Sequence, residues 1–264
     1  NFLFKGQFAS YEGSQMDGTV QRRRILAIAP EIVLPDRRVV EIYAEKWVVG
    51  TPLTDGWEGT PIRRTVICKL VTDEGWIMSP EAYVTESANT VAAKWNVEYL
   101  KNTVNTQSSS DYSPQFRTWL GLYEQIGQGW ILYGNTTTGA ARILIVRSLL
   151  EDPTGFIQIF ADEATNAYGL NAENRGTLAG GLDPITEETL PSTDIRLLLV
   201  DMYKMYNYRT AADEKLAAGD LAAYAESGVV SAGNTLTIQG FQFQVLRATE
   251  MPGTQVDILH LRKA

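Results

Sequence analysis

Residues 192–209 read STDIRLLLVDMYKMYNYR and form the most strongly patterned stretch of the chain. Apolar residues recur at helical spacing, at Ile195, Leu198, Leu199 and Met202 and beyond, so they share one side of a helical wheel. The polar residues at the start of the stretch can cap a first helical turn. The pattern therefore predicts an amphipathic helix over residues 193–209.

Working outward, a second stretch with helical spacing covers residues 114–126. Phe116, Trp119 and Tyr123 fall on one face, and Gly127 lies where a glycine commonly ends a helix. We expect an amphipathic helix here as well. Shorter helical turns are predicted from Ser79 and, in the alanine-rich part of the chain, between residues 210 and 228.

Most of the remaining chain has the character of β-strands. Val91 to Tyr99 alternates apolar and polar residues with a period of two, as a half-buried strand does. Further strands are predicted over residues 37–49, 62–71, 130–133, 142–150 and 156–161, and a turn is predicted at Asp73 to Gly75. The segments 235–238, 241–246 and 255–261, separated by glycine turns, predict a C-terminal three-stranded meander. The expected class is α+β, rich in antiparallel strands, with two amphipathic helices.

A serine-rich polar stretch, residues 102–113, is the best candidate for a domain boundary. It would separate a β-rich region over residues 1–104 from a mixed α/β region over residues 113–264. The alternative is a single domain across the whole chain, which its 264 residues allow.

Composition restricts the classes of partner. The net charge of −8 disfavours nucleic-acid binding through a general basic surface. No apolar run approaches the roughly 20 residues that a membrane-spanning helix needs, and the first residues do not resemble a signal peptide. Cys68 is the only cysteine, which excludes a disulfide framework within the chain.

Charges and aromatic residues are unevenly distributed. The N-terminal phenylalanines must be buried, either in the chain's own core or against a neighbour, and several pairs of arginines follow them. We interpret these residues as candidate subunit contacts: Phe2, Phe4, Phe8, Arg22, Arg23, Arg24, Arg37, Arg38, Arg63 and Arg64. A later tract is acidic, and its residues are candidates for an interface or for a channel wall: Glu151, Asp152, Asp162, Glu163, Glu173, Asp183, Glu187 and Glu188. The simpler interpretation is two solvated faces of opposite charge.

The sequence predicts no catalytic residue, no cofactor and no metal site. A Ser–His–Asp triad would have to use His260, the only histidine, and a zinc site is disfavoured because one histidine and one cysteine cannot supply three or four nitrogen or sulfur ligands. We expect His260 on a strand surface or at a partner contact. Gly134–Gly139 has the glycine spacing of a phosphate loop, but alanines replace the lysine and hydroxyl residues, which predicts a hairpin turn instead.

A carbohydrate-binding or glycoside-hydrolysing protein is the alternative function, and a small-ligand-binding module is the third. Two carboxylates can hydrolyse a glycosidic bond without a histidine, and tryptophan rings can stack on sugars. Trp47, Trp95 and Trp119 lie in patterned segments and are expected in the core. Trp57, in a loop predicted for residues 51–61, is expected to be free to bind.

In general character the chain resembles a bacteriophage virion structural protein of the tail or head–tail junction. The resemblance rests on two connecting segments that contain glycine and threonine, Gly134–Gly139 and Asn174–Gly181, and on the mixture of predicted strands and helices. It implies a non-enzymatic homo-oligomer that forms a ring or tube for DNA passage and contacts other virion proteins. It also implies a place in the virion, assembled in the host cytoplasm, with no sequence-specific nucleic-acid binding and no membrane insertion.

Overall fold

The computed structural model describes residues 6–11, 23–34, 39–87, 90–99, 116–121, 125–164, 173–180, 191–201 and 219–264. Within these ranges only the backbone is described for residues 8–11, 23, 173, 174, 200 and 201. The described chain contains 18 strands and one helix. None of its helical structure is long and apolar enough to span a membrane.

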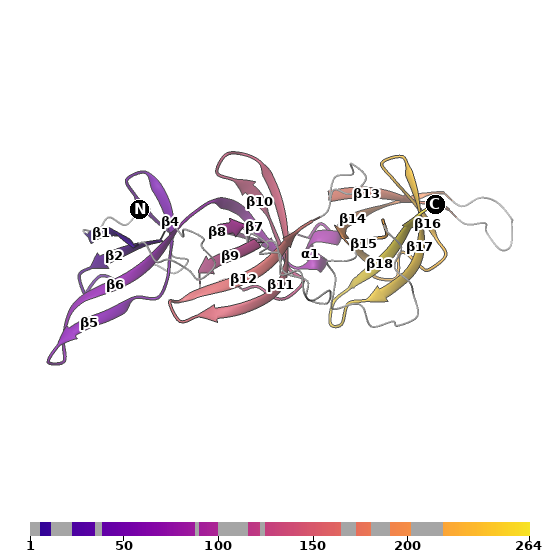
Figure 1. Ribbon diagram of the computed structural model, residues 1–264. Coiled ribbons are helices and arrows are strands. Elements are labelled where there is room, and N and C mark those ends of the chain that lie inside the picture. The colour runs from indigo at the N-terminus through magenta and orange to yellow at the C-terminus, as the bar shows by residue number, and fades with distance from the viewer. Residues whose placement is uncertain are drawn as a thin grey trace, which may run out of the picture.

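The strands form three antiparallel units, which follow one another along the chain and lie in a row (Figure 1). The N-terminal sheet consists of β1 (Gly6–Tyr11), β2 (Arg23–Ile28), β3 (Val39–Ile42), β4 (Glu45–Val49), β5 (Leu53–Trp57) and β6 (Thr60–Leu70). Its strand order is β1-β2-β6-β4-β3, and β5 pairs with β6 beyond the end of β4.

The other two units are closed six-stranded barrels. The middle barrel has the order β10-β11-β12-β9-β8-β7 and consists of β7 (Asp73–Met78), β8 (Thr90–Tyr99), β9 (Phe116–Gly121), β10 (Ile131–Thr136), β11 (Ala141–Asp152) and β12 (Phe156–Glu163). The C-terminal barrel has the order β13-β14-β15-β18-β17-β16 and consists of β13 (Glu173–Leu178), β14 (Thr193–Asp201), β15 (Leu221–Glu226), β16 (Thr235–Ile238), β17 (Phe241–Glu250) and β18 (Val256–Lys263).

Each barrel encloses its own apolar core. All six strands of the middle barrel contribute to one cluster, with Ile77, Trp95, Leu120, Leu132, Leu144 and Ile159 among its members. The C-terminal barrel is filled in the same way by a cluster that includes Leu197, Leu236, Phe243 and Leu259. Alternation along each strand directs these side chains inward, which is why period-two patterns suit this fold.

The helix α1 (Pro80–Val84) lies at the junction of the two barrels (Figure 1). Ser79 caps it by accepting a hydrogen bond from the Ala82 N–H at 3.1 Å, and Pro80 occupies the first turn. The predicted helix start at Ser79 is therefore confirmed. Tyr83 of α1 packs in one buried cluster with Ile131 of the middle barrel and Leu198 of the C-terminal barrel, so the junction is an apolar core in its own right.

The predicted α+β class is wrong, because both predicted amphipathic helices are strands where the chain is described. Residues 116–121 form β9 and residues 193–201 form β14, while residues 202–209 lie outside the described residues. β9 and the middle of β14 are buried on both faces. Leu197 and Leu199 point into the barrel and Leu198 into the junction, so apolar residues follow one another without a gap. A continuous apolar run matches helical spacing as well as it matches a strand.

Three further sequence predictions are corrected. Alanine-rich helical turns were expected before Gly228, but Leu221–Glu226 is strand β15, buried on both sides. Asp73 to Gly75 begins strand β7 and is not a turn. The loop expected over residues 51–61 contains β5. By contrast, the C-terminal meander is confirmed, since β16, β17 and β18 pair in succession as part of the barrel.

The predicted domain boundary falls where residues 100–115 are not described. The strands on its two sides, β8 and β9, pair with each other in the middle barrel through Asn96 to Tyr99. The N-terminal sheet meets this barrel through a cluster of Val48, Val71, Trp119 and Phe156.

Candidate functional site

The most exposed element of the described chain is a two-stranded ribbon made of β5 and the first half of β6. Pairing between β2 and β6 ends at Ile28 and Arg64, whereas β5 stays paired with β6 as far as Trp57 and Thr60. Residues 53–64, called the ribbon below, therefore extend past the sheet, as Figure 1 shows at lower left. A ribbon of this kind is only marginally stable on its own in water.

Local chemistry explains why the ribbon keeps its shape. Glu58 and Gly59 have φ angles of 49° and 80°, the combination required by a two-residue type I′ turn. Arg63 Nε and Thr65 Oγ1 donate hydrogen bonds to Asp55 Oδ2, at 2.8 and 2.9 Å. These hydrogen bonds, that of Arg63 first, lower the pKa of Asp55 from its ordinary value.

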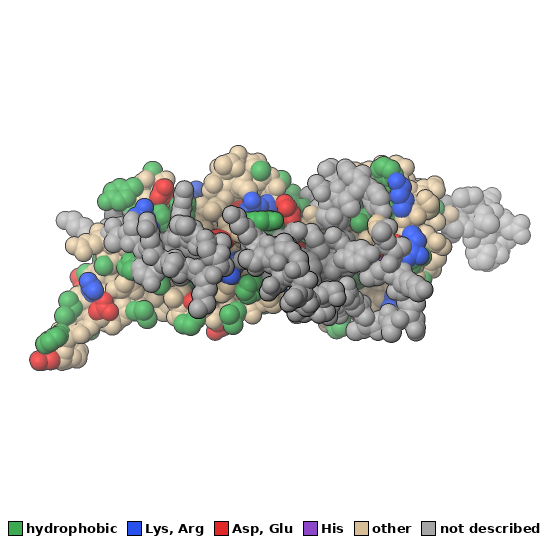
Figure 2. Space-filling view, in the orientation of Figure 1, with side chains coloured by type: hydrophobic (Ala, Val, Ile, Leu, Met, Phe, Trp, Pro, Cys, Tyr) green, Lys and Arg blue, Asp and Glu red, His purple; other side chains and the backbone are tan. Residues whose placement is uncertain are grey.

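The ribbon carries large apolar side chains that are open to solvent. Leu53, Trp57 and Ile62 are 57%, 71% and 61% exposed. Figure 2 shows hydrophobic side chains along the projecting ribbon. Trp57 was expected to be free for binding, and its exposure agrees with that expectation. Exposed large apolar side chains that gather on one element often mark a surface that another molecule covers.

A second hairpin offers apolar residues close to the base of the ribbon. Leu149 and Leu150, near the end of β11, are 37% and 56% exposed. Pairing between β10 and β11 covers only Ala141 to Ile145, so in the described structure this end of β11 pairs with β12 alone. The turn of this hairpin touches the N-terminal sheet, since the Thr51 N–H donates to the Thr154 carbonyl at 3.0 Å.

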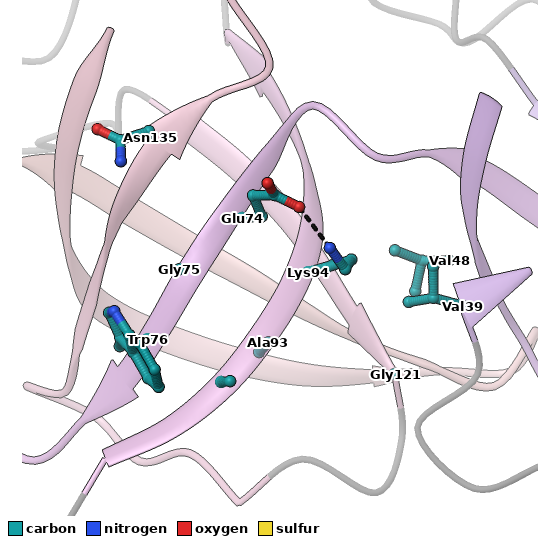
Figure 3. A pocket seen from close by; sticks show the side chains of 10 residues that line it. Val39, Val48, Glu74, Gly75, Trp76, Ala93, Lys94, Gly121 and Asn135 are labelled. Atoms are coloured by element: carbon teal, nitrogen blue, oxygen red, sulfur yellow. Dashed lines mark hydrogen bonds and ion pairs between the residues drawn. The ribbon is translucent and has the colours of Figure 1, made fainter. Parts of the chain in front are cut away.

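A cleft of about 480 Å³ lies on the outer face of the middle barrel, where the barrel meets the N-terminal sheet (Figure 3). Trp76 and Glu74 of β7, Lys94 of β8 and Asn135 of β10 line its floor. Val39 and Val48 of the N-terminal sheet close one end, beyond Lys94. The alternation of β7 places Glu74 and Trp76 on the same outward face.

The charges in the cleft are arranged around Glu74. Lys94 Nζ and Lys46 Nζ both donate to the same oxygen, Glu74 Oε2, with Lys46 at 3.5 Å. The hydrogen bond and charge of Lys94, followed by the influence of Lys46, lower the pKa of Glu74 from its ordinary value. The carboxylate is therefore ionised and fixed in position near neutral pH, ready to accept a further hydrogen bond at Oε1.

A second hollow, of about 650 Å³, lies beside α1 at the junction of the barrels. Arg175 and Arg196 line it, and both form ion pairs with Glu86, that of Arg196 at 3.8 Å. Arg196 also lies over the Tyr83 ring, 4.2 Å from its centre. These contacts hold α1 against the C-terminal barrel.

His260 is buried and does not lie on a strand surface, which corrects the sequence prediction. Its Nε2 lies 2.8 Å from Asp220 Oδ2, and Arg262 binds both oxygens of Asp220 at 2.9 and 2.8 Å. Cys68 is buried in the N-terminal sheet, a different unit from His260. Among the residues described, no three side chains of His, Cys, Asp or Glu are placed to hold a metal ion.

The predicted subunit contacts are only partly described. Phe2, Phe4, Arg22, Arg37 and Arg38 lie outside the described residues, and for Phe8 on β1 and Arg23 on β2 the backbone alone is described. Arg24 is half-buried on β2. Arg63 and Arg64 both lie on the ribbon, where Arg64 Nη1 donates to the Ile32 carbonyl at 3.1 Å. Their role as subunit contacts stays a prediction.

The predicted acidic residues are distributed over two barrels. Glu151 and Asp152 end β11, Asp162 and Glu163 end β12, and Glu173 begins β13, while Asp183, Glu187 and Glu188 lie outside the described residues. Asp162 is buried and accepts a hydrogen bond from Arg147 Nε at 2.6 Å. Asp152 accepts from the Thr154 N–H at 2.7 Å and so shapes the β11–β12 turn.

The sequence prediction missed the cleft around Trp76. The available signal was the spacing of Glu74 and Trp76 by two residues, which places both on one face of any strand that contains them. Interpreting Asp73 to Gly75 as a turn removed that signal. No family model, no curated protein and no solved structure matches this chain.

Proposed function

We propose that this protein is a structural subunit of a bacteriophage virion, which self-assembles into a ring or tube in the tail or at the head–tail junction. The observation that supports the proposal is the ribbon with its exposed Leu53, Trp57 and Ile62. A surface of this kind is stable in solution when a neighbouring copy covers it. The three units in a row give each copy an elongated body along which a neighbour can pack (Figure 1).

The free energy expected from the ribbon contact favours a closed assembly over an isolated pair of copies. Covering the exposed parts of three large apolar side chains contributes roughly 3–5 kcal/mol. Association costs at least about 4 kcal/mol in lost translational and rotational freedom. One ribbon contact is therefore weak alone, and additional contact at Leu149 and Leu150, or closure of a ring in which every copy uses two contacts, makes it stable.

The test compares the protein with a ribbon variant that combines Leu53→Ser, Trp57→Ser and Ile62→Ser. We expect the unaltered chain to show a discrete oligomeric mass by light scattering, with rings or short tubes in electron micrographs. The ribbon variant should be a folded monomer. Tyr43→Asn is the matched control, because Tyr43 is 88% exposed in the same sheet but lies outside the ribbon, and asparagine tolerates its φ of 52°.

Two results would contradict the proposal. One is a monomeric mass for the unaltered chain at every concentration up to the millimolar range. The other is assembly of the ribbon variant with the same mass and concentration dependence as the control.

A further inference from the structure

The cleft on the middle barrel contains polar groups that have no partner among the described residues. The Trp76 indole N–H and the Asn135 side-chain amide form no hydrogen bond there, and both lysines that bind Glu74 use Oε2, which leaves Oε1 open. Trp76 is 46% exposed, and Glu74 and Asn135 are also exposed. An acceptor, an amide and a flat aromatic ring thus face the same hollow (Figure 3).

Strand register fixes the spacing of these groups. Asn135 lies directly opposite Glu74 in the β7–β10 pair, which places their Cβ atoms about 4.5–5.5 Å apart. Trp76 follows two residues along β7 on the same face. Trp76 itself lies opposite Tyr133 of β10 and Ala92 of β8. Its ring stays 46% exposed beside this pair of hydrogen-bonding groups.

We propose that this cleft binds a neutral oligosaccharide, with the C–H face of one pyranose ring on Trp76 and two adjacent hydroxyls bonded to Glu74 and Asn135. A sugar hydroxyl both donates and accepts, so it can donate to the Glu74 carboxylate, while its neighbour pairs with the amide, which does both. Aromatic rings provide the apolar surface that such a ligand needs beside a few directed polar groups.

Charge and size further define the ligand. The charged residues that line the cleft, Lys94 and Glu74, form an ion pair with each other, so the cleft offers no net charge to attract an anionic sugar. Its volume of about 480 Å³ lies in the range of small-ligand sites, and Val39 and Val48 bound it at one end. Its floor lies on the middle barrel, and none of the ribbon residues lines it.

The experiment begins with the labelled full chain on an array of neutral and anionic oligosaccharides, including oligomers of glucose, N-acetylglucosamine, galactose and mannose. Calorimetry then measures the affinity of the best neutral binder for the chain and its variants. We expect Trp76→Ala and Glu74→Gln each to weaken binding at least about tenfold, without loss of thermal stability greater than that of the control. Trp57→Ala, which removes the more exposed tryptophan of the ribbon, should bind as the unaltered chain does.

Several outcomes would overturn the proposal. These are the absence of binding to any neutral oligosaccharide at millimolar concentration, binding of anionic sugars alone, and loss of binding in Trp57→Ala with retention in Trp76→Ala. Because each variant changes an exposed side chain, a folded protein is expected in every case, and its melting temperature is recorded beside its affinity.

Discussion

Cys68 lies on β6 with its side chain in the core of the N-terminal sheet, in a cluster with Leu26, Trp47 and Val66. Burial raises the pKa of its thiol to about 12. A cysteine thiol in the unfolded chain has a pKa near 8.5. Each unit by which the pKa differs between the folded and unfolded chain corresponds to about 1.4 kcal/mol in the free energy of unfolding. The favourable contribution of Cys68 is therefore complete below about pH 8.5 and is lost as the pH rises from there towards 12.

We expect the free energy of unfolding of the unaltered chain to fall more steeply between pH 9 and 11 than that of Cys68→Ser. The difference in slope should approach 1.4 kcal/mol per pH unit by the linkage relation. Urea unfolding at several pH values, followed by tryptophan fluorescence, measures it. Equal slopes for the two proteins, or rapid alkylation of the native thiol at pH 8, would show that Cys68 is accessible.

The burial of single residues could be predicted from the sequence where one face of a strand is in contact with solvent. Trp47 and Trp95 were expected in the core because each lies in a patterned strand segment, and both are buried. Trp119 was expected on the buried face of a helix and is buried, although its segment is strand β9. Trp57 was expected to be free and is exposed. The partners of Glu74 across the sheet, Asn135 and Lys94, come from distant parts of the chain, so no local pattern could have brought them together.

At the scale of elements, the contact between the N-terminal sheet and the β11–β12 hairpin depends on Gly155. Its φ is +84°, and a Cβ atom built there would lie 2.0 Å from Thr51 Oγ1. Gly155→Ala should therefore destabilise the protein by about 1–2 kcal/mol for the left-handed backbone and by more for the separation of the two units. Gly139 is a matched control, with a φ of +89° and no atom within 4 Å of its Cβ position.

Thermal unfolding and limited proteolysis of the two variants separate these contributions. Gly155→Ala should melt below Gly139→Ala and should expose the join between β4 and β5 to protease. Similar melting temperatures for both variants would mean that the close approach of Thr51 and Gly155 is not needed for docking.

Strands could be predicted from the sequence where their two faces differ in polarity. β8, with a period of two, and the C-terminal meander, with its glycine turns, were located correctly. β9 and β14 were mistaken for helices because they are covered twice, once by a barrel interior and once by a neighbouring unit. The burial of the second face comes from the tertiary arrangement. A strand that is buried on both faces is apolar throughout, so it lacks the alternation of apolar and polar residues by which strands are identified.

At the scale of the whole molecule, the row of three units should be measurable in solution. A compact globule of 264 residues has a radius of gyration of about 18 Å. The ribbon variant, which we expect to be monomeric, should exceed that value clearly in small-angle X-ray scattering, since its mass is spread along one axis (Figure 1). A radius near 18 Å for the monomer would contradict the arrangement in a row.

The salt dependence of assembly distinguishes the kinds of contact that could join the copies. Raising the ionic strength from 0.1 to 1 M shortens the screening length from about 10 to about 3 Å, which weakens exposed ion pairs. Apolar contact through Leu53, Trp57 and Ile62 has no such dependence. An assembly held by the ribbon should therefore keep its mass across this range of ionic strength. If acidic residues face a channel, added salt relieves their mutual repulsion and so favours assembly. Dissociation at 1 M NaCl in sedimentation experiments would instead indicate that ion pairs between arginines and acidic residues hold the copies together, and that the ribbon does not.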